Sequence, residues 1–199
     1  MRQNFPLALG AAIVASTLSL AAQTPNSSAP APKPQAPATK TAPPAEIKTA
    51  MNADHHFAME AAEGGMAEVE LGQLAADKAS NGKVKEFGQR MVNDHGKAGD
   101  ELKSIASSKN ITLPAEINTK HKATKDRLSK LSGAAFDRAY MAEMVKDHQM
   151  DSAAFHKEAS TGKDAEIKAF ASKTSAMVDE HLKMAREAQK EVAAGKSTQ

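Results

Sequence analysis

The 199-residue chain carries 26 basic and 24 acidic residues, so its formal net charge is only +2. This balance gives no electrostatic footprint for nucleic acid, and we expect no nucleic-acid partner. The sequence contains no cysteine, which excludes disulfides, thiol catalysis, zinc–thiolate sites and a lipid anchor on cysteine. Only 4% of the residues are aromatic, and the abundance of Ala, Lys, Glu and Met favours helix over strand.

The first segment predicts export. Residues 1–22 combine Arg2, an apolar run from Leu7 to Leu20 and the small residues Ala21 and Ala22, which is typical of a secretory signal peptide. The apolar run is too short for a comfortable transmembrane helix, although an uncleaved anchor is the alternative. We therefore expect a periplasmic or otherwise exported protein, and association with the cell envelope is left open.

The next segment is predicted to be a Pro/Ala-rich linker without a fold, residues 23–50. Seven of the nine prolines lie between residues 23 and 46, among Ala, Ser, Thr and Lys. This composition favours extended, polyproline-like conformations and cannot bury a core. The folded domain is then expected over residues 51–195, followed by a disordered tail, residues 196–199.

The rest of the chain is predicted to be helical, because apolar residues recur with a period of 3.6 between short turns. The expected helices span about Asp54–Ser80, Lys83–Lys109, Ala115–Leu131, Ala134–Ser160 and Asp164–Ala194. Tight turns join the first helix to the second and the last two helices to each other. A long connection, residues 110–133, carries its own short helix. This order predicts an all-α, ferritin-like four-helix bundle with a long helix-containing crossover between its second and third long helices.

Three of the four long helices carry the same pattern near their midpoints: Met-Val, any residue, an acid, then His. The copies end at His95, His148 and His181. The two hairpin turns, Ala79–Lys83 and Ala159–Lys163, also resemble each other at an offset of 80, which maps Glu68 onto His148. Because these four residues lie on otherwise apolar helix faces, we expect one carboxylate and three imidazoles to converge in the core.

Such buried polar groups must bond to each other, to water or to a metal ion. The predicted metal ligands are Glu68, His95, His148 and His181. The acids next to the histidines, which we expect to support the ligands from outside, are Asp94, Asp147 and Glu180. The ligand set suits one divalent transition metal: Zn, Fe, Cu, Ni or Mn. A hydrogen-bonded core network without metal is the alternative.

A carboxylate di-iron centre is disfavoured, because ferritin-like di-iron proteins use Glu-x-x-His on two helices. The residues three positions before the histidines are Val92, Val145 and Val178. A mononuclear, histidine-rich site fits this pattern better.

Several motifs together resemble one bacterial family. They are Gly64–Gly72 (GGMAEVELG), Val84–Phe87 (VKEF), Asp94-His95, Leu113-Pro114, Gly133–Tyr140 (GAAFDRAY) and Asp147-His148. Over about residues 54–190 the chain is similar to the family called domain of unknown function 4142. The resemblance implies a ferritin-like fold and an exported protein, often described as a membrane or outer-membrane protein. It implies no activity.

Three functions compete at this point. The first is a periplasmic protein that binds or buffers a metal ion through the Glu/His cluster. The second is a non-catalytic envelope or stress-related interaction module, in which the cluster is a structural hydrogen-bond network. The third is a metal-dependent oxidoreductase, which the missing Glu-x-x-His motifs make the least favoured, so the sequence favours a protein that is not an enzyme. Neither a partner nor an oligomeric state follows from the sequence.

Overall fold

The computed structural model describes the backbone of residues 44–195 and the side chains of residues 52–195. The predicted signal peptide, the linker up to residue 43 and the tail 196–199 lie outside the described residues. The described part contains five helices and no strand, which confirms the all-α prediction. The helices are α1 (Pro44–Lys78), α2 (Gly82–Ser108), α3 (Thr119–Ser129), α4 (Gly133–Thr161) and α5 (Ala165–Ala193). None of these helices is both long and apolar enough to cross a membrane.

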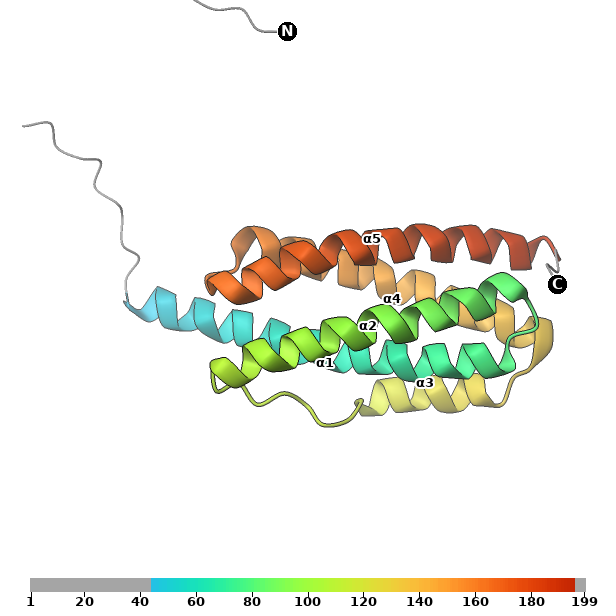
Figure 1. Cartoon of the computed structure of the whole chain (residues 1–199), viewed down its shortest axis with the longest axis horizontal. Helices are drawn as coiled ribbons and strands as arrows, with labels where there is room; N and C mark the ends of the chain where they lie inside the picture. Colours follow the sequence, from blue (N-terminus) through green and yellow to red (C-terminus); the bar gives the residue numbers. More distant parts are fainter. Residues whose placement is uncertain (1–43, 196–199) are drawn as a thin grey trace, which may run out of the picture. The chain divides into compact units, whose positions relative to one another are not determined.

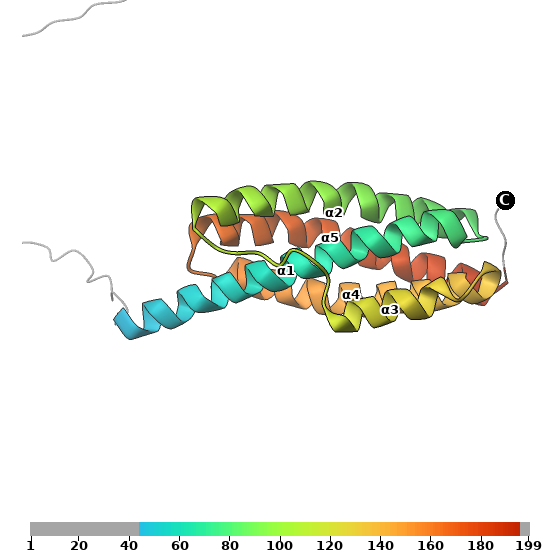
Figure 2. The ribbon, with the colours of Figure 1, turned by 90° about the horizontal axis from the view of Figure 1, so that it is seen from below.

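The four long helices lie side by side and form two hairpins (Figures 1 and 2). Helix α1 packs chiefly against α2, and α4 packs chiefly against α5. The two hairpins meet through α2 against α5 and α1 against α4. Helix α2 ends at one end of the helical domain and α4 begins at the other, so the connection that carries α3 runs along the domain (Figure 1).

The first helix begins ten residues earlier than the sequence predicts. It starts at Pro44, whereas the expected start is Asp54, so residues 44–50 are helical and do not belong to the predicted linker. Proline suits the first position of a helix, because its missing N–H would have no partner there. Residues 45–53 contain neither Gly nor Pro, so nothing interrupts the helix after this start.

Side-chain caps define where three of the other helices begin. Asn81, Asn118 and Asp164 accept N–H hydrogen bonds from the first turns of α2, α3 and α5. The sequence predicts that α3 begins at Ala115. It begins at Thr119, because Asn118 caps its first turn. The remaining helix ends agree with the predicted ones within one or two residues.

Each hairpin turn is also held by an aspartate from the other hairpin. Asp137, near the start of α4, accepts backbone N–H bonds from Ser80 and Asn81, both at 3.0 Å. Asp54 of α1 accepts backbone N–H bonds from the last two residues of the α4–α5 turn, Lys163 and Asp164, at 2.9 and 2.5 Å. These reciprocal bonds tie the two hairpins together at opposite ends of the domain.

The core consists of two apolar clusters. The first contains Leu71, Ala75, Ala79, Val84, Phe87, Met91, Leu128, Phe136, Tyr140, Met141, Met144, Ala185, Ala188 and Val192. The second contains Phe57, Ala58, Leu102, Phe155, Ile167, Phe170, Ala171 and Val178. Each long helix contributes residues to both clusters. On each helix, a segment near the middle separates the residues of one cluster from those of the other. The candidate site lies in this interval.

Candidate metal centre

A layer of buried polar side chains lies between the two apolar clusters. It is formed by Glu68 of α1, His95 of α2, His148 of α4 and His181 of α5, none of which is more than 6% exposed. On its own helix, each of the four follows residues of one cluster and precedes residues of the other. The structure therefore brings together the four residues that the sequence pattern selects.

The three imidazole rings face one another. Their centroids are separated by 5.8 Å for His95 and His148, 5.2 Å for His95 and His181, and 5.5 Å for His148 and His181. One ring nitrogen from each histidine lies within 4.8 Å of the other two. Nitrogens that share a tetrahedral metal lie about 3.4 Å apart, given bond lengths near 2 Å. Small ring rotations would therefore bring the three nitrogens to ligand distance.

Two of the imidazoles use one nitrogen in a hydrogen bond to an oxygen, and His95 places one nitrogen in an ion-pair contact. Nδ1 of His95 lies 2.8 Å from Oε2 of Glu68, and Nε2 of His181 lies 3.0 Å from Oδ2 of Asp94. Nδ1 of His148 lies 2.9 Å from a carbonyl oxygen one turn earlier in α4. Carboxylate and carbonyl oxygens only accept hydrogen bonds, so these three nitrogens carry the protons and donate them.

The opposite nitrogens have no partner. Among the described residues, Nε2 of His95, Nε2 of His148 and Nδ1 of His181 are buried without a hydrogen bond. In the tautomers set by the hydrogen bonds, each of these nitrogens carries a lone pair. A single water molecule has two hydrogens and can satisfy only two of the three. One cation can accept all three lone pairs, which is the arrangement that a metal site requires.

Burial keeps the histidines neutral. It lowers the pKa of His95 to about 4 and the pKa of His181 to about 4. Burial also lowers the pKa of His148, against the opposing effect of the Glu68 charge. A neutral imidazole is the form that binds metal. At neutral pH the three histidines therefore do not have to release a proton before they bind an ion.

Glu68 lies beside two of the rings. Its Oε2 is 2.8 Å from Nδ1 of His95, and its Oε1, which is buried without a hydrogen bond, is 3.3 Å from Nδ1 of His148. Burial raises the pKa of Glu68 to about 7. The sequence predicts Glu68 among the ligands; in the structure its carboxylate lies next to His95 and His148, so it joins the cluster as expected, and its place among the ligands stays a prediction.

The three acids expected to support the ligands have different surroundings. Asp94 accepts from His181 and, at 2.8 Å, from Nε of Arg90. Burial alone would raise the pKa of Asp94, but the hydrogen bonds from His181 and Arg90 lower it below its ordinary value. Glu180 is largely exposed and lies 3.3 Å from Arg90. Asp147 makes no described hydrogen bond to any of the three imidazoles, so only Asp94 supports a ligand directly.

Two residues near the site were not selected from the sequence. Arg90 precedes Asp94 by four residues, a spacing that places both on one helix face and could have identified it. Asp151 follows His148 by three residues and faces Glu68. Burial, together with the nearby Glu68 charge, raises the pKa of Asp151 to about 8. The spacing of three residues from His148 could have indicated Asp151, but only the structure shows it in the same pocket wall as Glu68.

The sequence profile named "Domain of unknown function (DUF4142)" matches residues 36–188. The chain belongs to the DUF4142 family. This match confirms the resemblance that the sequence motifs suggest. No curated protein and no solved structure matches the chain at a significant level. The family description assigns no activity, so the function of this DUF4142 protein has to be argued from its own site.

Proposed function

We propose that this DUF4142 protein binds one divalent transition-metal ion through His95, His148 and His181 in the core of a ferritin-like four-helix bundle. Two observations support it most strongly: one ring nitrogen from each of the three buried histidines lies within 4.8 Å of the other two, and each ring has a buried nitrogen without a hydrogen bond. Glu68 and Asp94 hold the rings by their protonated nitrogens, which sets the tautomers and increases the basicity of the ligands. The fourth coordination position is left for water or another small ligand.

The donor set restricts the metal. Three neutral imidazoles suit Zn, Cu, Ni and Fe, whereas Mn prefers carboxylate oxygens. The carboxylates in contact with the rings hydrogen-bond to the protonated nitrogens instead of pointing at the converging ones. We therefore place Zn, Cu and Ni first among the candidate ions.

We further propose that the protein works outside the cytoplasm, in the periplasm or at the cell envelope. The support for this is the signal-peptide pattern of residues 1–22 and the proline-rich segment after it. A role in binding or buffering metal fits the site better than turnover of a substrate, because the three imidazoles are at most 6% exposed.

The test uses tag-free protein and two histidines of one helix. Metal analysis and titration calorimetry with Zn²⁺, Ni²⁺ and Co²⁺ should give about one ion per chain, and saturation at 100 times Kd should add roughly 2.7 kcal/mol of stability. His148→Gln should abolish this binding. His156→Gln is the matched control, because His156 lies two turns later in α4, is exposed and bonds to Asp179.

A structural hydrogen-bond network without metal predicts a different result. If the cluster is only a hydrogen-bond network, His148→Gln changes the melting temperature but no ion shifts it in either protein. Absence of bound metal together with no thermal shift from any of these ions would refute the metal proposal. The interaction-module interpretation would then stand.

A further inference from the structure

Two surface pockets reach the polar layer from different faces of α1. The first, which we call the acidic pocket, has a volume of about 450 Å³, lies between α1, α4 and the start of α3, and has Glu68 in its wall. The second, which we call the glycine pocket, has a volume of about 580 Å³, lies between α1, α2 and the loop 113–116, and has His95 in its wall. The histidines themselves are nearly inaccessible, so these pockets are the two candidate approaches for an ion.

The carboxylates of the glycine pocket are neutralised. Each of its three acidic side chains forms an ion pair with a lysine, at N–O distances of 2.7 to 3.3 Å. The pairs are Glu70–Lys125, Glu116–Lys122 and Asp100–Lys103. A cation approaching from this side meets lysine charges next to every carboxylate.

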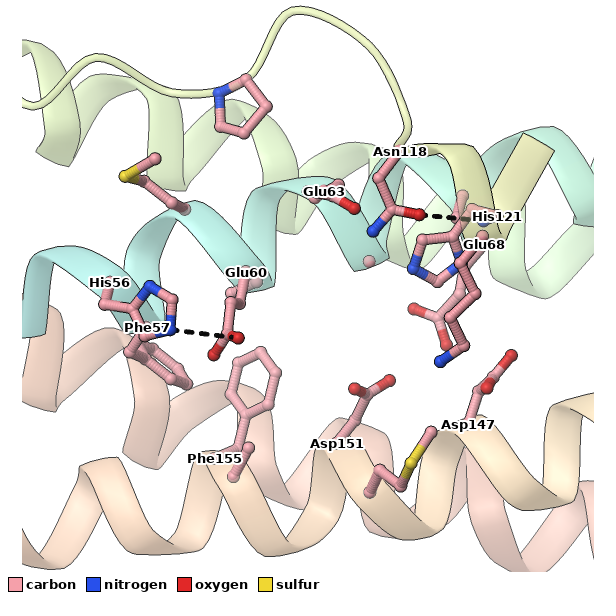
Figure 3. Close-up of a pocket in the computed structure, with 18 of the residues that line it drawn as sticks. His56, Phe57, Glu60, Glu63, Glu68, Asn118, His121, Asp147, Asp151 and Phe155 are labelled. Carbon is pink, nitrogen blue, oxygen red and sulfur yellow. Dashed lines mark hydrogen bonds and ion pairs between the residues drawn. The ribbon is translucent and has the colours of Figure 1, made fainter. Parts of the chain in front are cut away.

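The acidic pocket is different. Figure 3 shows Glu63 and Glu68 of α1 on one side of the pocket, and Asp147 and Asp151 of α4 on the other. None of these four carboxylates forms an ion pair with a lysine or arginine in the described part of the chain. Two basic side chains of α3, Lys120 and His121, also line the pocket and act on Asp147. Burial raises the pKa of Asp151 to about 8, so above that pH all the unpaired carboxylates of the pocket can attract cations to this opening.

Glu68 connects this pocket to the histidines. On the pocket side it interacts with Asp151, and on the core side it accepts from His95. A cation between Asp151 and Glu68 would therefore lie next to the carboxylate that contacts His95 and His148.

We propose that the acidic pocket is the entrance through which a hydrated divalent transition-metal cation reaches the three histidines, with Asp151 receiving the ion and Glu68 passing it inward. This inference rests on the proposed metal function. It assigns Asp151 a positioning role in ion uptake and release and no place among the final ligands.

The test measures how fast Co²⁺ enters the metal-free full-length protein, by stopped-flow absorption of the histidine-bound ion, and how fast a chelator removes it. The rates are measured above the Asp151 pKa of about 8, where the side chain is charged, and there Asp151→Asn should slow entry and exit together by about tenfold. Because an entrance accelerates both directions equally, Kd should stay within about twofold. Asp100→Asn in the glycine pocket is the matched charge control and should change neither rate.

A second pair of variants blocks the pockets without changing charge. Gly64 lines the acidic pocket and Gly99 lines the glycine pocket, and a Cβ at either position would have no heavy atom within 4 Å. Both are interior helix positions, where leucine is a better helix former than glycine. Gly64→Leu should slow entry and exit, and Gly99→Leu should leave both unchanged.

The outcomes separate the two proposals. If the wild type binds no Co²⁺, the metal function fails and the entrance fails with it. If the wild type binds Co²⁺ but Asp151→Asn and Gly64→Leu leave both rates unchanged, only the entrance is refuted. Slowing by Gly99→Leu would assign the route to the glycine pocket. A weaker Kd with unchanged entry in Asp151→Asn would make Asp151 a ligand and would also overturn the inference.

Discussion

Glu68 and Asp151 occupy corresponding positions in the two helical hairpins, and their side chains interact beside the histidine cluster. The correspondence follows from the reciprocal turn bonds, because Asp54 and Asp137 are separated by 83 residues (137 − 54), as are Glu68 and Asp151 (151 − 68). The sequence comparison used an offset of 80 and paired Glu68 with His148. The tertiary contacts pair carboxylate with carboxylate and place them at the acidic pocket.

The first prediction concerns the bond between Asp94 and His181. Asp94→Ala should weaken metal binding by about 10- to 100-fold, because the His181 ring loses the acceptor that sets its tautomer and orientation. Affinity is measured by competition with a chelator. Glu180→Ala is the control, since Glu180 contacts the same Arg90 but no histidine. Equal affinities of the two variants would mean that Asp94 does not support the ligand.

The second prediction concerns the turn bonds of Asp137. This carboxylate is 2% exposed and accepts two backbone N–H bonds at the α1–α2 turn. Asp137→Ala leaves both donors without their acceptor and should lower the free energy of unfolding by about 1–3 kcal/mol, measured by urea denaturation. The exposed Asp126→Ala serves as the control and should stay within about 0.5 kcal/mol of the wild type. An equally small effect at Asp137 would contradict the assigned role.

The third prediction concerns the close crossing of α1 and α2. A Cβ at Gly72 would lie 2.6 Å from the carbonyl oxygen of Gly88, which is backbone and cannot move aside alone. Gly72→Ala should therefore destabilise the protein by about 1–3 kcal/mol through overpacking. Gly96→Ala is the matched change in α2, where a Cβ meets nothing within 4 Å, and it should stabilise by roughly 0.5–1 kcal/mol. Thermal denaturation should show a lower melting temperature for Gly72→Ala and a higher one for Gly96→Ala than for the wild type.

The fourth prediction is a pH dependence from Glu158. Burial, together with the charge of Asp54 and a hydrogen bond to it, raises the pKa of Glu158 from 4.5 to about 7. A raised pKa in the folded state means that the protonated group stabilises the fold. This contribution is complete below about pH 4.5 and is lost as the pH rises through about 7.

Glu158→Gln keeps a neutral side chain at every pH and tests this directly. Relative to the wild type, the variant should be more stable at pH 8 than at pH 5, measured by urea denaturation at both values. The buried histidines titrate in both proteins, so their effect cancels in the difference. Glu116→Gln, at an exposed glutamate paired with Lys122, should show no such change. If the difference in the free energy of unfolding between Glu158→Gln and the wild type is the same at pH 5 and pH 8, Glu158 is not the source of the pH dependence.

The sequence by itself determined the helices and the composition of the polar layer. Apolar periodicity and the cap residues Asn81 and Asp164 define helix ends closely, because both depend on interactions within a few residues. The repeated Met-Val-x-acid-His pattern identified His95, His148 and His181, since it places one histidine near the middle of each of three helices. The early start of α1 was missed because local proline density outweighed the helical residues that follow Pro44.

Only the tertiary structure decided which atoms of the polar layer meet. Helix periodicity places a side chain on a face, but the rotation of each helix about its axis and the side-chain rotamers depend on packing against neighbouring helices. That packing turns Glu68 toward the protonated nitrogens, leaves three lone pairs converging, and brings Asp151 to the acidic pocket. One of the three lysine–carboxylate pairs of the glycine pocket, Glu70–Lys125, joins residues 55 positions apart, which local sequence patterns cannot specify.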